Sequence, residues 1–134
     1  MVTVKNNTLI ISAQDYERLV ALIEQNNTPA AAMLDDELAR AKIVPESQLP
    51  GDVVAMNSYV TFIDCDSEEE LTVSLVYPAN ANVEEMKISI LSPVGSALIG
   101  LQVGGEIDWP LPNGKKRHLQ VTAVIQPIKI PTKN

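Results

Sequence analysis

The stretch of sequence that decides the fold reads Ile88-Ser89-Ile90-Leu91-Ser92-Pro93-Val94-Gly95-Ser96-Ala97-Leu98-Ile99-Gly100-Leu101-Gln102-Val103-Gly104-Gly105-Glu106-Ile107. It predicts a strand, a sharp turn, one short helix and a second strand. Ser92 suits the N-cap of the helix, Pro93 its first position and Gly100 its C-terminal stop. No titratable residue lies between Lys87 and Glu106. The segment is therefore suited to packing or docking and not to catalysis.

Outward from this stretch, the C-terminal part of the chain predicts a sheet of five or six largely antiparallel strands. An apolar run occupies 53–56, a strand is expected at 59–63, and Asn113-Gly114 is typical of a hairpin turn. Apolar residues alternate with a period of two at Leu71, Val73, Leu75 and Tyr77, at Ile88 and Ile90, at Ile107 and Trp109, and at Leu119, Val121, Ala123 and Ile125. A sheet with one apolar face and a single helix must lay that helix across it.

The N-terminal part predicts two helices after a short strand-like start at 8–11. Ser12 offers an N-cap with Asp15 three residues on, and Thr28-Pro29 offers a second one. Apolar residues follow at helical spacing at Tyr16, Leu19, Val20 and Ile23, and then at Ala31, Leu34, Leu38 and Ala41. Because the connection is short, the helices should form an antiparallel hairpin of about 15 residues per helix.

The proline- and glycine-containing run at 42–51 predicts a linker. We therefore expect an α+β protein with a short coiled-coil hairpin over 1–48 and a sheet domain over 49–134. One small domain plus one appendage is compatible with the length of 134 residues.

The composition argues against several kinds of partner. The formal net charge is −7 and no basic stripe is present, so direct binding to nucleic acid is disfavoured. The one basic cluster, Lys115-Lys116-Arg117, is expected to be a solvated turn. Cys65 is the single cysteine, which fits a reducing compartment and an inert thiol. With neither a signal-peptide pattern nor an apolar run of ~20 residues, we expect a cytoplasmic protein without a membrane partner.

No constellation of residues points to catalysis, a metal or a cofactor. His118 is the only histidine, and strand alternation places it on the solvent side. The acidic run Asp64–Glu70 carries Glu69 where a calcium loop needs glycine, so a solvated loop is expected. A G-x-S-x-G elbow, a G-x-G-x-x-G turn and a phosphate loop are all missing from the sequence.

The segment Ser89–Gly100, followed by Val103-Gly104 and Glu106, resembles the C-terminal domain of the Gre transcript-cleavage factors, which carry S-x-L-S-P-[IV]-G-x-A-L-[LI]-G and then a V-G-[DE] turn. Gly105 departs from the family, which often has an acid there. The runs 50–58 and 72–78 resemble the Rnk family, regulators of nucleoside diphosphate kinase, more than Gre factors themselves. The resemblance covers 50–126 well and the hairpin only in its organisation.

This resemblance implies an FKBP-like domain that docks on RNA polymerase near the rim of the secondary channel. Carried over residue by residue, the contact would be formed or supported by Ser92, Pro93, Val94, Gly95, Leu98 and Ile99. Prolyl isomerase activity is not expected, because that chemistry needs an aromatic-lined pocket and fold alone does not confer function.

The hairpin tip bears on the chemistry. In Gre factors, a long coiled coil carries tip acids that hold a catalytic metal ion. Here the tip comprises Glu24, Gln25, Asn26 and Asn27, so it has one acid. Short helices and a single tip carboxylate favour a non-enzymatic competitor of Gre factors, which we expect to be a monomer. The alternatives are a degenerate cleavage factor using Glu24 with Asp35 or Asp36, and a regulator of nucleoside diphosphate kinase levels.

Overall fold

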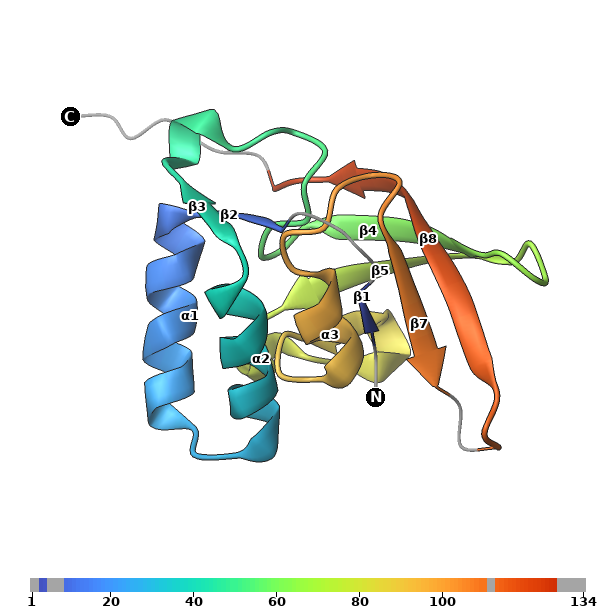
Figure 1. The fold of residues 1–134 in the computed structure, drawn as a ribbon, viewed down its shortest axis with the longest axis horizontal. Helices are drawn as coiled ribbons and strands as arrows, with labels where there is room; N and C mark the ends of the chain where they lie inside the picture. Colours follow the sequence, from blue (N-terminus) through green and yellow to red (C-terminus); the bar gives the residue numbers. More distant parts are fainter. Residues whose placement is uncertain (1–2, 5–8, 111–112, 128–134) are drawn as a thin grey trace.

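The computed structural model describes residues 3–4, 9–110 and 113–127, and the side chains of 9–108 and 113–127 among them. The chain folds as α+β, as the sequence predicts (Figure 1). The helices are α1 (Ala13–Gln25), α2 (Pro29–Ala39) and α3 (Pro93–Leu98). The strands are β1 (Thr3–Val4), β2 (Ile10–Ser12), β3 (Lys42–Val44), β4 (Tyr59–Asp64), β5 (Glu70–Val76), β6 (Lys87–Ser89), β7 (Glu106–Pro110) and β8 (Lys116–Ile125).

The larger sheet of the described residues has six strands in the order β1-β7-β8-β4-β5-β6. Its strands pair antiparallel except β5 and β6, which pair parallel with Leu75 opposite Ile88. The expectation of an antiparallel sheet is therefore wrong at this edge. The physical reason is the connection at 77–86, whose short 3-10 turns carry the chain back along the sheet before β6 begins.

Strand β8 contains a β-bulge that the alternation pattern does not reveal. Thr61 of β4 pairs with Ala123 and Phe62 pairs with Val121, so one residue of β8 is left over between them. An extra residue moves the following side chains to the opposite face. Leu119 and Val121 are buried as predicted, whereas Ala123 and Ile125 are exposed. The predicted single apolar face for these four residues is therefore wrong beyond the bulge.

The N-terminal helices begin where the sequence predicts. The Ser12 side chain accepts a hydrogen bond from the Asp15 amide (3.1 Å), and Thr28 accepts one from the Ala31 amide (3.1 Å). Helices α1 and α2 lie side by side (Figure 1) and have 13 and 11 residues, shorter than the expected 15. The apolar face of α2 packs on α1 and on α3, which buries Leu34 completely.

Two short segments depart from the predicted elements. Residues 42–44, predicted to begin the linker, form β3 and pair in parallel with β2. Residues 53–56, the apolar run that the prediction of five or six strands left open as a sixth, form no strand and contribute one bridge between Val53 and Gln102. The side chain of Trp109, predicted on the core face, lies outside the described residues, as do 1–2, 5–8, 111–112 and 128–134.

One apolar core joins the helices to the sheet. Leu19 of α1 and Leu34 of α2 belong to the same buried cluster as Phe62 of β4 and Leu98 of α3. Leu9 and Ile11, from the segment before α1, belong to the same cluster. The α1–α2 pair is thus packed on the sheet domain and is not a free appendage.

Candidate docking site at helix α3

Helix α3 begins in an interlocked turn of hydroxyl groups. Ser92 Oγ accepts a hydrogen bond from the Gly95 amide (3.0 Å) and donates one to the Ser89 carbonyl oxygen (2.7 Å). The Ser89 hydroxyl in turn accepts one from the Leu91 amide (3.0 Å). The predicted N-cap at Ser92 and the proline at the first helical position are confirmed. The helix ends at Leu98, two residues before Gly100, the predicted C-terminal stop.

Gly95 lets α3 pack tightly onto the chain that precedes it. A Cβ atom at this position would lie 2.1 Å from the Ser89 carbonyl oxygen and 2.9 Å from its carbon. Backbone atoms cannot move aside as a flexible side chain can. The S-P-x-G pattern is therefore explained by packing: the serine caps the helix and the glycine makes room for it.

The six predicted docking residues differ in their exposure. Pro93 is exposed and Ser92 is half-buried. Val94 is 5% exposed, and Leu98 and Ile99 are 0% exposed. Gly95 is buried as well. A partner that approaches the folded protein would thus meet Pro93 and the edge of Ser92, and the other four would support that surface from beneath.

An apolar concavity lies beside Pro93. It is lined by Val83, Ile88, Ser92, Pro93 and Val94. Val83 stands 84% exposed in a short 3-10 turn, which Asn82 holds by accepting a hydrogen bond from the Glu84 amide (3.1 Å). The sequence reasoning missed Val83 and Ile88. The available signal was a single apolar residue within an otherwise polar turn.

The predicted hairpin-tip residues lie at the opposite end of the α1–α2 pair from the chain's entry into α1. Gln25 is exposed at the end of α1, and Asn26 caps that end by donating from Nδ2 to the Leu22 carbonyl oxygen (2.7 Å). Glu24, Asn26, Asn27 and Asp35 all line one open concavity, whereas Asp36 does not. Among the described residues, no group of three or more His, Cys, Asp and Glu side chains is placed to hold a metal ion.

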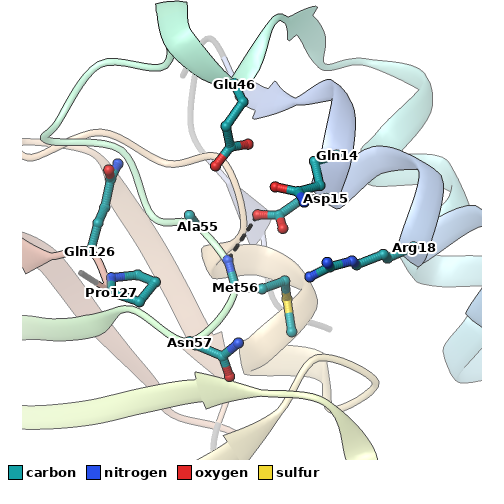
Figure 2. A pocket seen from close by; sticks show the side chains of 9 residues that line it. All are labelled: Gln14, Asp15, Arg18, Glu46, Ala55, Met56, Asn57, Gln126 and Pro127. Atoms are coloured by element: carbon teal, nitrogen blue, oxygen red, sulfur yellow. Dashed lines mark hydrogen bonds between the residues drawn. The ribbon is translucent and has the colours of Figure 1, made fainter. Parts of the chain in front are cut away.

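A small polar pocket marks the junction between α1 and the sheet domain (Figure 2). The Asp15 amide donates to Ser12 Oγ, as the predicted N-cap requires, and the Asp15 carboxylate Oδ2 accepts a hydrogen bond from the Met56 amide (3.1 Å). Gln126 closes another side by donating from Nε2 to the Pro50 and Val53 carbonyl oxygens, both at 2.8 Å.

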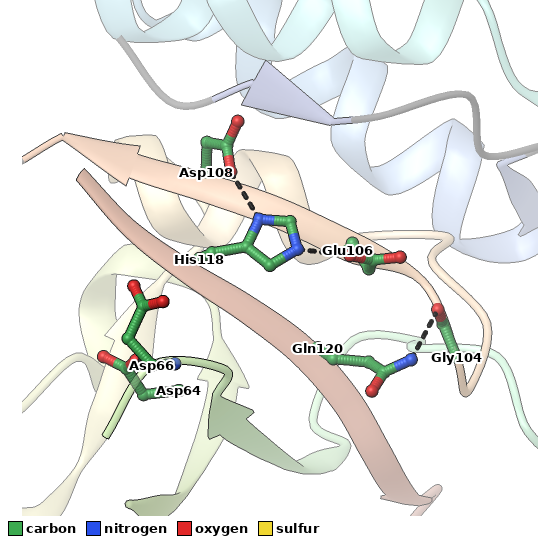
Figure 3. Close-up of polar contacts among 7 residues, drawn as sticks. All are labelled: Asp64, Asp66, Gly104, Glu106, Asp108, His118 and Gln120. Carbon is green, nitrogen blue, oxygen red and sulfur yellow. Dashed lines mark hydrogen bonds and ion pairs between the residues drawn. The ribbon is translucent and has the colours of Figure 1, made fainter. Parts of the chain in front are cut away.

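His118 lies on the outward face of the sheet, as predicted, but it is not an isolated surface residue (Figure 3). Its Nδ1 lies 2.6 Å from Asp108 Oδ1, and its Nε2 contacts Glu106 Oε1. Ionised carboxylates only accept hydrogen bonds, so a doubly protonated ring satisfies both contacts. The cluster joins β7 to β8.

The acidic loop after β4 is held by its first carboxylate. Asp64 Oδ1 accepts hydrogen bonds from the amides of Asp66 (2.9 Å) and Ser67 (3.2 Å), and Arg117 Nε donates to Oδ2 (2.9 Å). The Arg117 guanidinium and then the two amides lower the pKa of Asp64 below its usual range. Residues 65–70 are exposed. Of the basic cluster predicted as a solvated turn, Lys115 and Lys116 are exposed, whereas Arg117 is half-buried by this pairing.

The structure combines a capped and buried short helix, a mixed sheet and two further short helices, and comparison with known proteins places this combination in the Gre-factor class. Residues 49–126 match the family "Transcription elongation factor, GreA/GreB, C-term", and residues 7–44 match "Rnk N-terminus". The chain belongs to the Rnk family, and the resemblance seen in the sequence is confirmed.

Relatives and solved structures agree with this assignment. The chain is 42% identical over 117 residues to the regulator of nucleoside diphosphate kinase of Escherichia coli K12, covering 85% of this chain and 86% of that protein. It is 40% identical over 91 residues to the GreA elongation factor of Rhodospirillum rubrum, covering 68% of this chain and 57% of that protein. No helix among the described residues is long and apolar enough to cross a membrane.

The solved structures show the same fold. A GreA/GreB elongation factor from Nitrosomonas europaea superposes with a TM-score of 0.78 at 44% identity, over 89% of this chain and 98% of that chain. GreA factor homolog 1 of Thermus thermophilus superposes with a TM-score of 0.51 at 28% identity, over 90% of this chain and all of that chain. The fold is thus Gre-like.

Proposed function

We propose that this protein is a non-enzymatic regulator of transcription that binds RNA polymerase near the secondary channel and competes there with Gre factors. In this proposal it acts in the cytoplasm as a monomer, without a cofactor or direct contact to nucleic acid. The helical hairpin over 1–48 and the FKBP-like domain over 49–134 form its two parts.

The observation that carries the proposal is a GreA/GreB-type C-terminal region that presents Pro93 beside an apolar concavity. Burial of the apolar side chains around this concavity by a partner protein would be favourable. None of the five residues that line the concavity is charged. The charged residues nearest in sequence are Glu84 and Glu85 in the turn before β6, and Lys87 at the start of β6. A partner would therefore be recognised there by shape and by apolar burial.

The dimensions of the helices support binding without cleavage. At ~1.5 Å per residue, α1 and α2 are about 20 and 17 Å long, which is short for a segment that must enter a deep channel. Glu24 at their tip shares a concavity with Asp35, which lies further along α2. Because Mg²⁺ is commonly held by one or two carboxylates together with water and substrate ligands, it is the shortness of the helices, and not the number of carboxylates, that disfavours cleavage.

Co-purification with core RNA polymerase tests the docking site. Val83→Asp places a charge in the apolar concavity and should sharply reduce the amount of protein retained, and Pro93→Ala should reduce it less. Val103→Asp is the matched control, because Val103 is also exposed (41%) but lies outside the concavity. Equal retention of all four proteins would contradict the site, and no retention of the wild type would contradict the function.

A degenerate cleavage factor is the second candidate, favoured by the shared concavity of Glu24 and Asp35. It predicts Mg²⁺-dependent shortening of RNA in a stalled elongation complex, lost in Glu24→Ala and Asp35→Ala. Asp36→Ala is the control, because Asp36 does not line the concavity. The first proposal predicts no shortening above that of polymerase alone for any of these proteins.

The link to nucleoside diphosphate kinase comes from the name of the Escherichia coli relative. We propose that the protein affects the kinase by changing transcription of its gene and not by acting on the enzyme. Adding the purified protein to nucleoside diphosphate kinase should then leave the kinase activity unchanged, while deleting the gene should change the level of the kinase transcript. A direct change in the activity of the pure kinase would contradict this proposal.

A further inference from the structure

Gly100 is the point where the N-terminal segment meets the end of α3. Its carbonyl oxygen accepts a hydrogen bond from the Ile10 amide (3.0 Å), and its amide donates to the Val54 carbonyl oxygen (2.9 Å). It adopts φ +80°, a conformation that favours glycine. A Cβ there would lie 3.1 Å from both the Ile10 oxygen and Ile11 Cγ1. Gly100 therefore ends α3 and also lets β2 approach it.

Asp15 makes a second contact across the same junction. It lies in the first turn of α1, yet its carboxylate accepts a hydrogen bond from the Met56 amide, 41 residues further along the chain (Figure 2). Tyr77, after β5, lies near the same carboxylate: burial and then the charge of Asp15 raise the pKa of its hydroxyl. The start of α1 is thus hydrogen-bonded to the loop at Met56 and lies near the loop after β5.

The surface that these contacts frame is apolar and fully buried. Leu19 and Leu34 are 0% exposed, and both belong to the cluster that contains Leu98 and Ile99 of the α3 region. Parts of a chain move relative to one another unless their interface is large and hydrophobic. Here the interface is hydrophobic and buried. The hydrogen bonds from Ile10 to Gly100 and from Met56 to Asp15 fix how the two parts are oriented.

We propose that Gly100 and Asp15 are positioning residues that hold the α1–α2 pair at one fixed angle to α3. The distance between the helical tip and the surface around Pro93 is then fixed. A partner that binds both surfaces must match that distance. The positioning role stands by itself, whereas the identity of the partner as RNA polymerase rests on the proposed function.

The separation can be measured between two spin labels in the full-length protein. Cys65 is exposed at the β4–β5 end of the sheet, and Ala32→Cys adds an exposed site on α2, on the opposite side of the molecule (Figure 1). Pulsed electron–electron double resonance then reports the distribution of distances between the labels. We expect one narrow distribution.

The variants separate positioning from stability. Gly100→Ala and Asp15→Ala should each broaden the distribution or add a second population, whereas Asp15→Asn, which keeps an acceptor oxygen, should retain the narrow one. Gly104→Ala is the matched control, because Gly104 has φ +94° but no atom within 4 Å of a Cβ. It carries comparable backbone strain without touching the junction and should leave the distribution narrow.

A broad distribution in the otherwise unchanged protein would overturn the proposal. So would distributions in folded Gly100→Ala and Asp15→Ala that are as narrow as that of Gly104→Ala. If Gly100→Ala does not fold, the comparison of Asp15→Ala with Asp15→Asn decides. A narrow distribution in a protein that does not co-purify with polymerase would contradict the proposed function and leave the positioning role intact. A broad distribution in a protein that does co-purify with polymerase would contradict the positioning role and leave the proposed function intact.

Discussion

Helix α3 and the tip of the α1–α2 pair are the two regions proposed to contact a partner, and they differ in how deeply their residues are buried. From Val94 to Gly100 every residue is buried, whereas Glu24, Gln25 and Asn27 are exposed. The segment that carries the family motif is thus fixed mainly by packing, and only its rim can meet a partner. A dense sequence motif can therefore mark a tightly packed scaffold as much as a contact.

The substitution expected to separate the two regions most is Gly95→Ala. Because the new Cβ would overlap the Ser89 carbonyl oxygen at 2.1 Å, we expect a loss of about 3 kcal/mol or more in the free energy of unfolding. Urea denaturation measures it. Gly51→Ala is the control, since nothing lies within 4 Å of its Cβ. A loss for Gly95→Ala no larger than the control's would show that α3 is less tightly packed than described.

Ser92→Ala should have the next largest effect. It removes the acceptor for the Gly95 amide and the donor to the Ser89 carbonyl oxygen, which should cost about 1–2 kcal/mol. Ser67→Ala serves as the control, because Ser67 makes its bond (3.3 Å, from the Glu69 amide) in an exposed loop. Thermal or urea unfolding of both variants measures the difference, and equal effects would refute the interlocked turn.

Asp64→Asn tests whether the charged turn after β4, like the apolar packing of α3, contributes to the free energy of unfolding. The pKa of Asp64 is lowered by Arg117 and two amides, so its ionised form stabilises the folded state above the ordinary carboxyl pKa of 3.8. That stability is lost as the pH falls through the lowered folded-state pKa. The stability difference between wild type and Asp64→Asn should thus be present at neutral pH and shrink below about pH 4. A difference independent of pH between 7 and 2 would contradict the pairing.

Asn27→Ala at the tip should have the smallest effect. Asn27 is exposed, and substitutions at such surface positions change the free energy of unfolding by less than about 0.5 kcal/mol. Asn26→Ala is the comparison, because Asn26 caps α1 through the Leu22 carbonyl oxygen and should cost more. If Asn27→Ala destabilised the protein as much as Ser92→Ala, the contrast between the two regions would be lost.

The features that could be predicted from the sequence are those set by neighbouring residues. The caps at Ser12, Thr28 and Ser92 each depend on a serine or threonine and an amide three residues on, so their signal is local. The family motif likewise led to the correct family.

The features that could not be predicted depend on residues far apart in the chain. The bulge in β8 is defined by its pairing with β4, and the parallel pairing of β5 with β6 is defined by the path at 77–86. The contact of Asp15 with the Met56 amide spans 41 residues. Val83 becomes a candidate contact only because the fold brings it beside Pro93.

The most direct test of the account is displacement of this protein from core RNA polymerase by a Gre factor. A fluorescently labelled protein is bound to polymerase and a Gre factor is titrated in. The account predicts complete displacement of the wild type, together with initial binding that is weaker for Val83→Asp than for Val103→Asp. Simultaneous binding of both proteins to one polymerase, or binding unaffected by Val83→Asp, would contradict it.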